Sequence, residues 1–403
     1  MPAEDPRPDF DPHWPVCTEE GCRGAQSEWE RRCLVHAEDL AGLRPGGDLD
    51  LRGAAVDSAK LVEIVYRFRD HENRAFMFGE LRCDHAWFSG RASFTGGEVR
   101  GVARFSDVHF GHLASFDGMA FASVLSFRGA RFPGRAYLGP LAAGDVDLAE
   151  TWFANRVSLD IEAEHVELVD AQFDGGLLLE TTGEVDANGT YFGAASTIHG
   201  AKVASLSGSD VSNLVLTDAD LSNCYFLGAH RLEQLRIDGR TTFARPRSRW
   251  RARRRMLADE GKEPPARVGA TYRALRKSLE DSKNEAGAGD FYYGEMECRR
   301  HSKESSLAER MILWCYWLLS GYGQRALRAL AWLVVVVSVV TGLLTVWGQD
   351  FGMAARIAVG AVVFRDDRTE LTAAGEWTVL VARFLGPVLL ALAVLAIRAR
   401  VKR

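Results

Sequence analysis

Residues 86–132 read "AWFSGRASFTGGEVRGVARFSDVHFGHLASFDGMAFASVLSFRGARF", and phenylalanine recurs in them at a short, nearly constant interval. From Phe105 onward, the steps alternate between five and six residues. An α-helix repeats every ~3.6 residues and a β-strand every two, so neither gives this spacing. A five- to six-residue repeat predicts a solenoid, in which each unit turns a corner and equivalent side chains stack in ladders. The phenylalanines stand at positions 88, 94, 105, 110, 116, 121, 127 and 132.

Small residues accompany the phenylalanines. An alanine lies two residues before many of them, and a large and a small side chain at this spacing can both point into a narrow core. The alternative interpretation, an irregular all-β domain, does not explain five consecutive steps of five or six residues. The register is looser over residues 139–210 and tightens again from Val211 to Phe226. The alanines are Ala86, Ala92, Ala103, Ala114 and Ala130.

The segment "ADLSN" at 219–223 matches the A-(D/N)-(L/F)-X-X unit of the pentapeptide-repeat family. The chain resembles this family over about residues 47–243, including its phenylalanine-rich variant with steps of five and six. The resemblance implies a mainly β fold, a right-handed quadrilateral β-helix with four pentapeptides per coil. Solenoids of this kind present surfaces rather than pockets.

The N-terminal segment, residues 1–46, contains the pattern C-x4-C-x10-C-x2-H, formed by Cys17, Cys22, Cys33 and His36. Four such ligands in two close pairs suit tetrahedral Zn²⁺ in a closed, structural site. Gly21 and Gly24 flank Cys22 and would let the chain turn tightly. Actinobacterial pentapeptide-repeat proteins often begin with a similar element, so the resemblance also implies zinc. The alternative is three free cysteines and a surface histidine.

Charge is distributed unevenly along the chain. The net charge is −5, but residues 1–244 hold 22 basic and 38 acidic side chains, a balance of −16. The following segment is basic and contains seven arginines that we expect to bind anionic lipid headgroups. Nucleic-acid binding and a solvated linker are the alternative interpretations. The seven residues are Arg245, Arg247, Arg249, Arg251, Arg253, Arg254 and Arg255.

Residues 244–320 are predicted to form this basic linker, then an αα-hairpin and an interfacial helix. In the hairpin, which resembles one tetratricopeptide unit, Tyr272, Leu275 and Leu279 share one helical face, and Ala286–Gly289 is predicted as the turn. Glu295 and Glu297 point apart on a helix, so they are interpreted as surface or ion-pair residues.

Two segments are long and apolar enough to span a bilayer. Ala329–Trp347 contains no charged residue, and Trp377–Ile397 is interrupted only by Arg383. They predict a two-transmembrane domain over 321–403, with spans at about 329–347 and 377–397. The N-terminal segment contains no apolar run, so no signal peptide is expected. Basic residues before the first span and after the second predict a multi-pass cell-membrane protein with both termini cytoplasmic.

Between the spans, Met353–Phe364 is apolar but too short to cross, as in a re-entrant segment. Many pentapeptide-repeat proteins carry a two-transmembrane, ion-channel-like domain of this layout at the C-terminus. Here nothing like T-V-G-Y-G follows the segment, so a carbonyl filter is not supported. Asp366 and Asp367 could form an acidic ring in an oligomer. Arg383 would either extend toward the interface or face a pore.

The tripeptide Gly321-Tyr322-Gly323 occurs in potassium filters, but here it precedes the first span, so we expect a helix break. The sequence contains no phosphate-binding loop, nucleophile elbow or dinucleotide fingerprint, so we expect no enzyme. The expected function is a membrane-anchored scaffold or sensor, a homo-oligomer whose solenoid binds an unknown protein partner. The alternatives are an ion-channel-like pore gated by the cytoplasmic domain and a DNA-mimicking regulator; nucleic acid is not expected as a partner.

Overall fold

The structure is a computed structural model of the chain and describes residues 10–70, 75–246, 254–363, 365 and 371–401. Two compact units make up the chain, Met1–Lys262 and Glu263–Arg403. The first unit contains a parallel β-solenoid of about eight turns, and the second consists of helices, two of them long and apolar. This confirms the predicted fold class. The unit boundary falls inside the predicted segment 244–320, because residues 254–262 pack back onto the solenoid.

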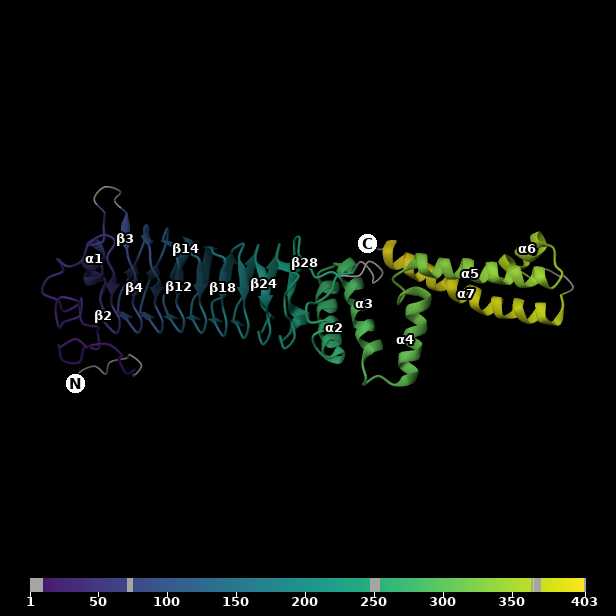
Figure 1. Cartoon of the computed structure of the whole chain (residues 1–403), viewed down its shortest axis with the longest axis horizontal. Helices are drawn as coiled ribbons and strands as arrows, with labels where there is room; N and C mark the ends of the chain where they lie inside the picture. The colour runs from purple at the N-terminus through teal and green to yellow at the C-terminus, as the bar shows by residue number, and fades with distance from the viewer. Residues whose placement is uncertain (1–9, 71–74, 247–253, 364, 366–370, 402–403) are drawn as a thin grey trace. The chain divides into compact units, whose positions relative to one another are not determined.

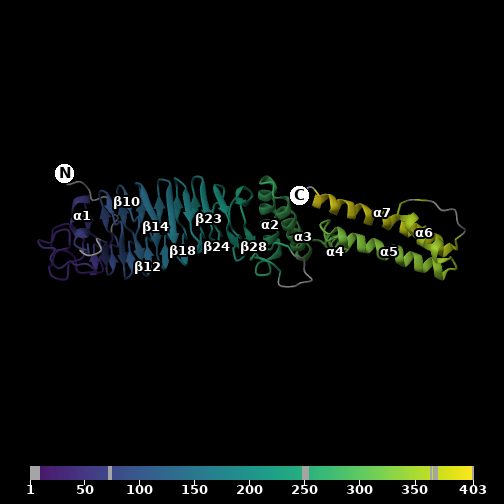
Figure 2. The same cartoon turned by 90° about the horizontal axis from the view of Figure 1, so that it is seen from above.

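The described strands of the solenoid form three parallel sheets that run along its length (Figures 1 and 2). The first sheet has the order β1 (Leu49–Asp50), β4 (Leu81–Arg82), β8 (Ala103–Arg104), β12 (Val124–Ser126), β15 (Asp145–Asp147), β18 (His165–Glu167), β21 (Glu184–Asp186), β24 (Lys202–Ser205), β26 (Asp220–Leu221) and β28 (Thr242–Phe243). The second has the order β2 (Ala55–Val56), β5 (Trp87–Phe88), β9 (His109–Phe110), β13 (Arg131–Phe132), β16 (Trp152–Phe153), β19 (Gln172–Phe173) and β22 (Tyr191–Phe192). The third has the order β27 (Arg236–Asp238), β25 (Leu214–Thr217), β23 (Ser196–His199), β20 (Leu177–Glu180), β17 (Val157–Glu162), β14 (Ala136–Ala142), β11 (Ala120–Phe121), β7 (Gly97–Val99) and β3 (Phe76–Phe78), with β10 (Ala114–Ser115) joining β14 to β6 (Ala92–Ser93).

The coil length matches the phenylalanine spacing. Ala103 pairs with Leu125 on the next coil, an interval that equals two steps of five and two of six. Along the same sheet the interval shortens, and Glu184 pairs with Lys202. The coil from β4 to β7 has four strands, but in a later coil β14 pairs with both β10 and β11. One continuous strand therefore replaces two short ones, which explains the looser repeat in the middle of the solenoid.

The core is a stack of aromatic rings. Phenylalanines from successive strands of the second sheet lie face to face, with ring centroids 4.5 to 6.1 Å apart. None of these side chains is more than 1% exposed, and the alanines that were predicted to point inward are buried as well. Since each ring removes a large apolar area from water, the ladder contributes strongly to the stability of the solenoid. The stacked residues are Phe88, Phe110, Phe132, Phe153, Phe173 and Phe192.

One corner of each coil adopts a left-handed backbone conformation, which glycine and aspartate tolerate better than most residues. Where a glycine follows an aspartate by one coil, the carboxylate covers the glycine. A methyl group on Gly129 would overlap the Asp107 carboxylate, and one on Gly189 would overlap Asp170. The residues with positive φ at this corner are His85, Asp107, Gly129, Glu150, Asp170, Gly189, Gly208 and Gly228.

The C-terminal end of the solenoid is closed by residues that follow the last strand. A short 3₁₀ turn, η1 (Leu232–Gln234), lies in the last coil, and Met256 then bridges back to Ala244. The buried carboxylate of Asp259 accepts hydrogen bonds from the backbone N–H groups of Phe226 (3.2 Å) and Leu227 (3.3 Å). This cap satisfies donors that the end of a sheet would otherwise leave unpaired. At the other end, helix α1 (Ser58–Tyr66) packs its apolar face onto the first coils.

The second unit contains α2 (Pro265–Asp281), α3 (Glu285–His301), α4 (Leu307–Ser320), α5 (Ala326–Val346), α6 (Phe351–Val362) and α7 (Ala373–Val401). Helices α2 and α3 form the predicted hairpin, and Tyr272, Leu275 and Leu279 are fully buried in it as expected. Gly321 ends α4 in a left-handed conformation with φ 56°, which confirms the predicted helix break.

The predicted turn at Ala286–Gly289 is wrong, because these residues form the first turn of α3. The chain reverses earlier, at Ser282–Asn284, where the Asn284 side chain accepts a hydrogen bond from the Gly287 N–H at 3.0 Å. That cap starts the helix despite the glycines that follow it. Gly294, later in α3, allows close contact with α2, since a methyl group at this position would overlap the ring of Tyr272.

Candidate metal centre and membrane helices

The four predicted metal ligands converge at the N-terminus of the solenoid unit. The Cys17 N–H donates to the carbonyl of Gly24 (2.8 Å), which closes a loop around Cys22. Gly21 turns this loop with φ 75°. Gly24 lies against Cys33, and a methyl group at that position would overlap the Cys33 side chain. Gly21 therefore makes the tight turn that the sequence predicted, whereas Gly24 allows close packing against Cys33.

The ligand atoms of Cys17, Cys22, Cys33 and His36 all lie within 4.8 Å of one another. The two sulfurs of Cys22 and Cys33 are 3.7 Å apart, and the Nδ1 atom of His36 lies 3.7 Å from the Cys17 sulfur and 3.4 Å from the Cys33 sulfur. In a tetrahedral zinc site, typical bond lengths give edges of about 3.8 Å between two sulfurs and about 3.6 Å between sulfur and nitrogen. The donor set and these edges fit a tetrahedral metal ion.

The thiols form no disulfide, and those of Cys22 and Cys33 share a hydrogen bond. A Cys22–Cys33 distance of 3.7 Å is far longer than the ~2.05 Å of a disulfide. A hydrogen bond from the Cys33 thiol, helped by the Gly24 N–H and opposed by burial, lowers the pKa of Cys22 to about 5. The same hydrogen bond and burial raise the pKa of Cys33. The lowered pKa favours the thiolate form of Cys22, and the thiolate is the form that binds metals.

The metal centre is joined to the first coils of the solenoid. The Ala25 N–H donates to the carbonyl of Arg52 (2.8 Å), immediately after β1. A methyl group on Gly53 would overlap the carbonyl of Arg23, so the two segments are in close backbone contact. Phe10 stacks on His85 with ring centroids 4.5 Å apart. These contacts make the cysteine-containing segment a cap on the N-terminal end of the solenoid.

The basic segment is described only in part. Arg245 is exposed, and Arg255 lies over the ring of Phe243. Arg254 is buried and pairs with Glu260 at 2.5 Å, so its guanidinium stabilises the C-terminal cap and does not face solvent. The other predicted headgroup contacts, Arg247, Arg249, Arg251 and Arg253, lie outside the described residues.

Helices α5 and α7 are long and apolar enough to cross a membrane, with mean hydropathies of 2.5 and 2.4. Unlike the helices of a water-soluble bundle, they present many large apolar side chains on their outer surface. The buried cluster that they form with α6 includes Ala354, Ala358, Ala361 and Ala382. The large outward side chains, all exposed, include Leu327, Val334, Val339, Val346, Trp377, Phe384, Val388 and Leu395.

The short helix α6 coincides with the predicted re-entrant segment and packs against both long helices. A methyl group on Gly386 of α7 would overlap Val362, so the two helices approach closely there. Arg383 is half-buried, and its Nη2 atom donates to the carbonyl of Arg365, after the end of α6, at 3.5 Å. Asp366 and Asp367 lie outside the described residues.

A cluster of aromatic and arginine side chains that the sequence did not predict joins α3, α4 and α5. Arg300, only 5% exposed, lies against the indoles of both Trp314 (4.3 Å) and Trp317 (4.5 Å) and pairs with Glu297 at 2.7 Å. Tyr322 is fully buried beside them, and burial together with the neighbouring Glu297 raises its pKa. The only signal in the sequence was the density of tryptophan and tyrosine in α4.

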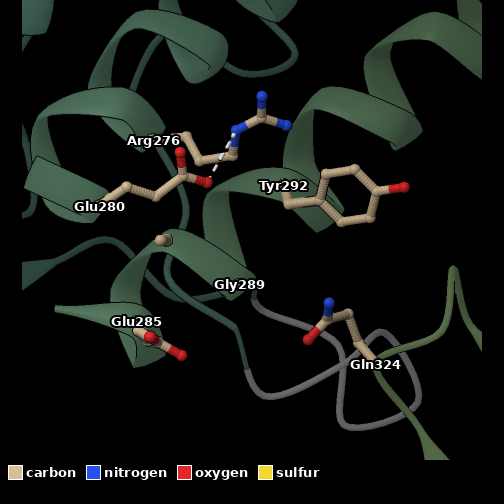
Figure 3. A pocket seen from close by; sticks show the side chains of 7 residues that line it. Arg276, Glu280, Glu285, Gly289, Tyr292 and Gln324 are labelled. Atoms are coloured by element: carbon tan, nitrogen blue, oxygen red, sulfur yellow. Dashed lines mark ion pairs between the residues drawn. The ribbon is translucent and has the colours of Figure 1, made fainter. Parts of the chain in front are cut away.

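The hairpin carries a shallow hollow that lies beside an ion pair between Arg276 and Glu280 (Figure 3). Arg276 also pairs with the buried Glu295 at 2.9 Å, which confirms the interpretation of Glu295 as an ion-pair residue. Among the residues that line the hollow, no nucleophile is paired with a base, and the arrangement is that of a structural ion-pair network. The lining residues are Arg276, Glu280, Glu285, Ala288, Gly289, Tyr292 and Gln324.

No family model matches this chain, and neither a curated protein nor a solved structure matches it.

Proposed function

We propose that the chain is a non-enzymatic membrane protein in which α5 and α7 anchor a solenoid that serves as a scaffold or sensor. The observation that carries the anchoring is the large apolar surface that these helices expose. Phe384 is 72% exposed and Val334 is 64% exposed. Exposing this large apolar surface to water is unfavourable, whereas the acyl chains of a bilayer would solvate it.

The solenoid supports a binding role because its repeated side chains fill the core, and the side chains that differ from coil to coil point outward. Large apolar side chains are exposed on two of its faces, among them Tyr137, Leu178 and Tyr191. The coil length, equal to two steps of five and two of six, and the phenylalanine ladder support a pentapeptide-repeat relationship. The basic residues that flank the helices support a cytoplasmic location for both termini.

We also propose that the metal at Cys17, Cys22, Cys33 and His36 is structural zinc. The ligand set leaves no open position at a four-coordinate ion, and the segment packs on the solenoid as a cap. A bound ion would tie the loop around Cys22 to the turn at Cys33 and would contribute directly to folding of this segment.

The binding role is tested by photo-crosslinking in native membranes from the full chain. A photoreactive residue replaces Tyr137, Leu178 or Tyr191 in turn, and a control carries it at Phe384, which we place against lipid. We expect a discrete adduct with a second protein, or with another copy of the chain, from at least one solenoid position and none from Phe384. Adducts from no solenoid position would refute the scaffold proposal.

A channel-like pore is a second candidate, and the observation that favours it is α6, a short apolar helix held between two long ones. Such a segment can line a pore when copies of the chain assemble around an axis. Planar-bilayer recordings of the purified full chain and of its Asp366→Asn/Asp367→Asn variant test this. Conductance that changes in the variant supports a pore, and silence of a folded oligomer removes the candidate.

A further inference from the structure

Helix α4 has an outer face that carries no charge, formed by Leu307, Met311, Ile312, Cys315 and Leu318. These positions recur with the spacing of one helical stripe. Leu307 is 75% exposed, and both Met311 and Ile312 are 68% exposed. The charged groups of α4 lie elsewhere on the helix, and Glu309 is paired with Arg299 of α3 at 2.6 Å.

The opposite side of α4 is held against α3, so the outer face cannot turn inward. Arg300 of α3 contacts both Trp314 and Trp317, and the Trp317 Nε1 atom donates to the hydroxyl of Tyr293 at 3.0 Å. Cation–π contacts of this kind are strongest when the cation is removed from water, as it is here. The orientation of the apolar stripe is therefore fixed by buried contacts.

The direction of α4 relative to α5 is set by contacts at the junction between the two helices. Gly321 breaks the chain after α4, and α5 begins at Ala326. Across this junction, Arg328 donates to the carbonyl of Trp317 (2.8 Å), and the Trp332 Nε1 atom donates to the carbonyl of Leu318 (3.0 Å). Figure 1 shows α4 running crosswise to α5 and α7. If α5 crosses a bilayer, α4 lies in the plane of its surface.

We propose that the outer face of α4 is immersed in the headgroup–acyl boundary of the lipid bilayer, as an interfacial helix parallel to the membrane. This inference rests on the proposed membrane anchoring and adds a second contact with the lipid. The face is separated by one short turn from the outward side of α5, where Leu327 is 76% exposed. It offers no charged group that could orient a protein partner, and tryptophan and arginine beside it suit this depth.

Spin labels on the full chain, in vesicles of phosphatidylcholine and phosphatidylglycerol, test the proposal. Cys315, the exposed native thiol on this face, is labelled directly; Met311→Cys and Leu318→Cys are made in a Cys315→Ser background. Leu327→Cys, Val334→Cys and Val339→Cys in the same background report on α5. The Cys315→Ser protein, loaded with zinc, is the blank for other thiols. The measurement compares collision rates with oxygen, which partitions into lipid, and with a water-soluble nickel chelate.

We expect the three α4 labels to collide more with oxygen than with the nickel chelate and to share one shallow depth. Depth along α5 should instead increase by about 1.5 Å per residue. Nickel-accessible α4 labels with lipid-exposed α5 labels would overturn the inference but leave the anchoring intact. Labels on α4 that are shielded from both reagents would also overturn it, since a protein would then cover the face. A steady depth gradient along α4 would overturn it too, because the helix would then not lie parallel to the membrane. Nickel-accessible labels on α5 would refute the anchoring itself.

Discussion

The left-handed corners of the solenoid offer a matched pair of substitutions, Gly96→Ala and Gly129→Ala. Both glycines have nearly the same backbone conformation, with φ values of 68° and 69°. A methyl group on Gly96 would meet no atom within 4 Å, whereas one on Gly129 would overlap the Asp107 carboxylate. The two variants therefore share the conformational cost and differ in one steric contact.

The shared cost of a left-handed alanine is about 1–2 kcal/mol. Overpacking typically adds about 1–3 kcal/mol, so Gly129→Ala should open the solenoid about 5- to 150-fold more often than Gly96→Ala. Cys83 and Cys224 are fully buried, so their alkylation rates in the full chain, measured by mass spectrometry, report this opening. Because solenoids open locally, we expect the larger change at Cys83, which is nearer in the stack.

The carboxylate contact has its own control. The double variant Asp107→Gly/Gly129→Ala removes the overlapping group while keeping a residue that tolerates the left-handed conformation. Its Cys83 labelling rate should return to that of Gly96→Ala. Equal rates for the two single variants, or no recovery in the double variant, would show that the Asp107–Gly129 contact does not shape this corner.

Three further predictions concern the ends and the surface of the solenoid. The purified chain should contain one zinc ion by elemental analysis; Cys33→Ser should lose it and Cys315→Ser should retain it, and unchanged zinc in Cys33→Ser would refute the site. Asp259→Asn should raise Cys224 labelling by about 10- to 150-fold, because hydrogen bonds to a charged acceptor contribute about 1.5–3 kcal/mol. An unchanged rate would show that Asp259 does not stabilise the C-terminal end of the solenoid. In an NMR titration, the pKa of His165 should lie above its ordinary value because the Asp145 carboxylate accepts a hydrogen bond from the ring, and Asp145→Asn should lower it. The pKa of His109 should lie below its ordinary value because the ring is partly buried, and the reverse order of the two would contradict the structure.

The solenoid could be predicted because its signal is local and repeated. Over residues 88–132 phenylalanine recurs at a nearly constant interval, so the length of these coils can be read directly from the spacing. The merged strands could not be predicted in this way. In β17, Val157, Leu159 and Ile161 point inward and alternate with exposed residues, a two-residue period that obscures the five-residue repeat.

The metal centre and the helix junction differ in how far the sequence determines them. Cysteine and histidine are rare and chemically specific, so their spacing alone predicted four ligands that the structure brings together. The contact of Arg300 with Trp314 and Trp317 joins two helices and follows no period, so it becomes visible only after folding. The run of seven arginines likewise predicted that all of them contact lipid headgroups, but Arg254 is buried against Glu260.

The proposed anchoring is tested most directly by two matched cysteine variants of the full chain, Ala122→Cys on the solenoid and Ala374→Cys at the start of α7. Both alanines are exposed. In intact cells, a membrane-impermeant maleimide should label Ala374→Cys, because the proposed topology puts the segment between the two spans on the outside, and should label Ala122→Cys only after lysis. Labelling of both variants only after lysis, or recovery of the chain in the soluble fraction, would contradict the account.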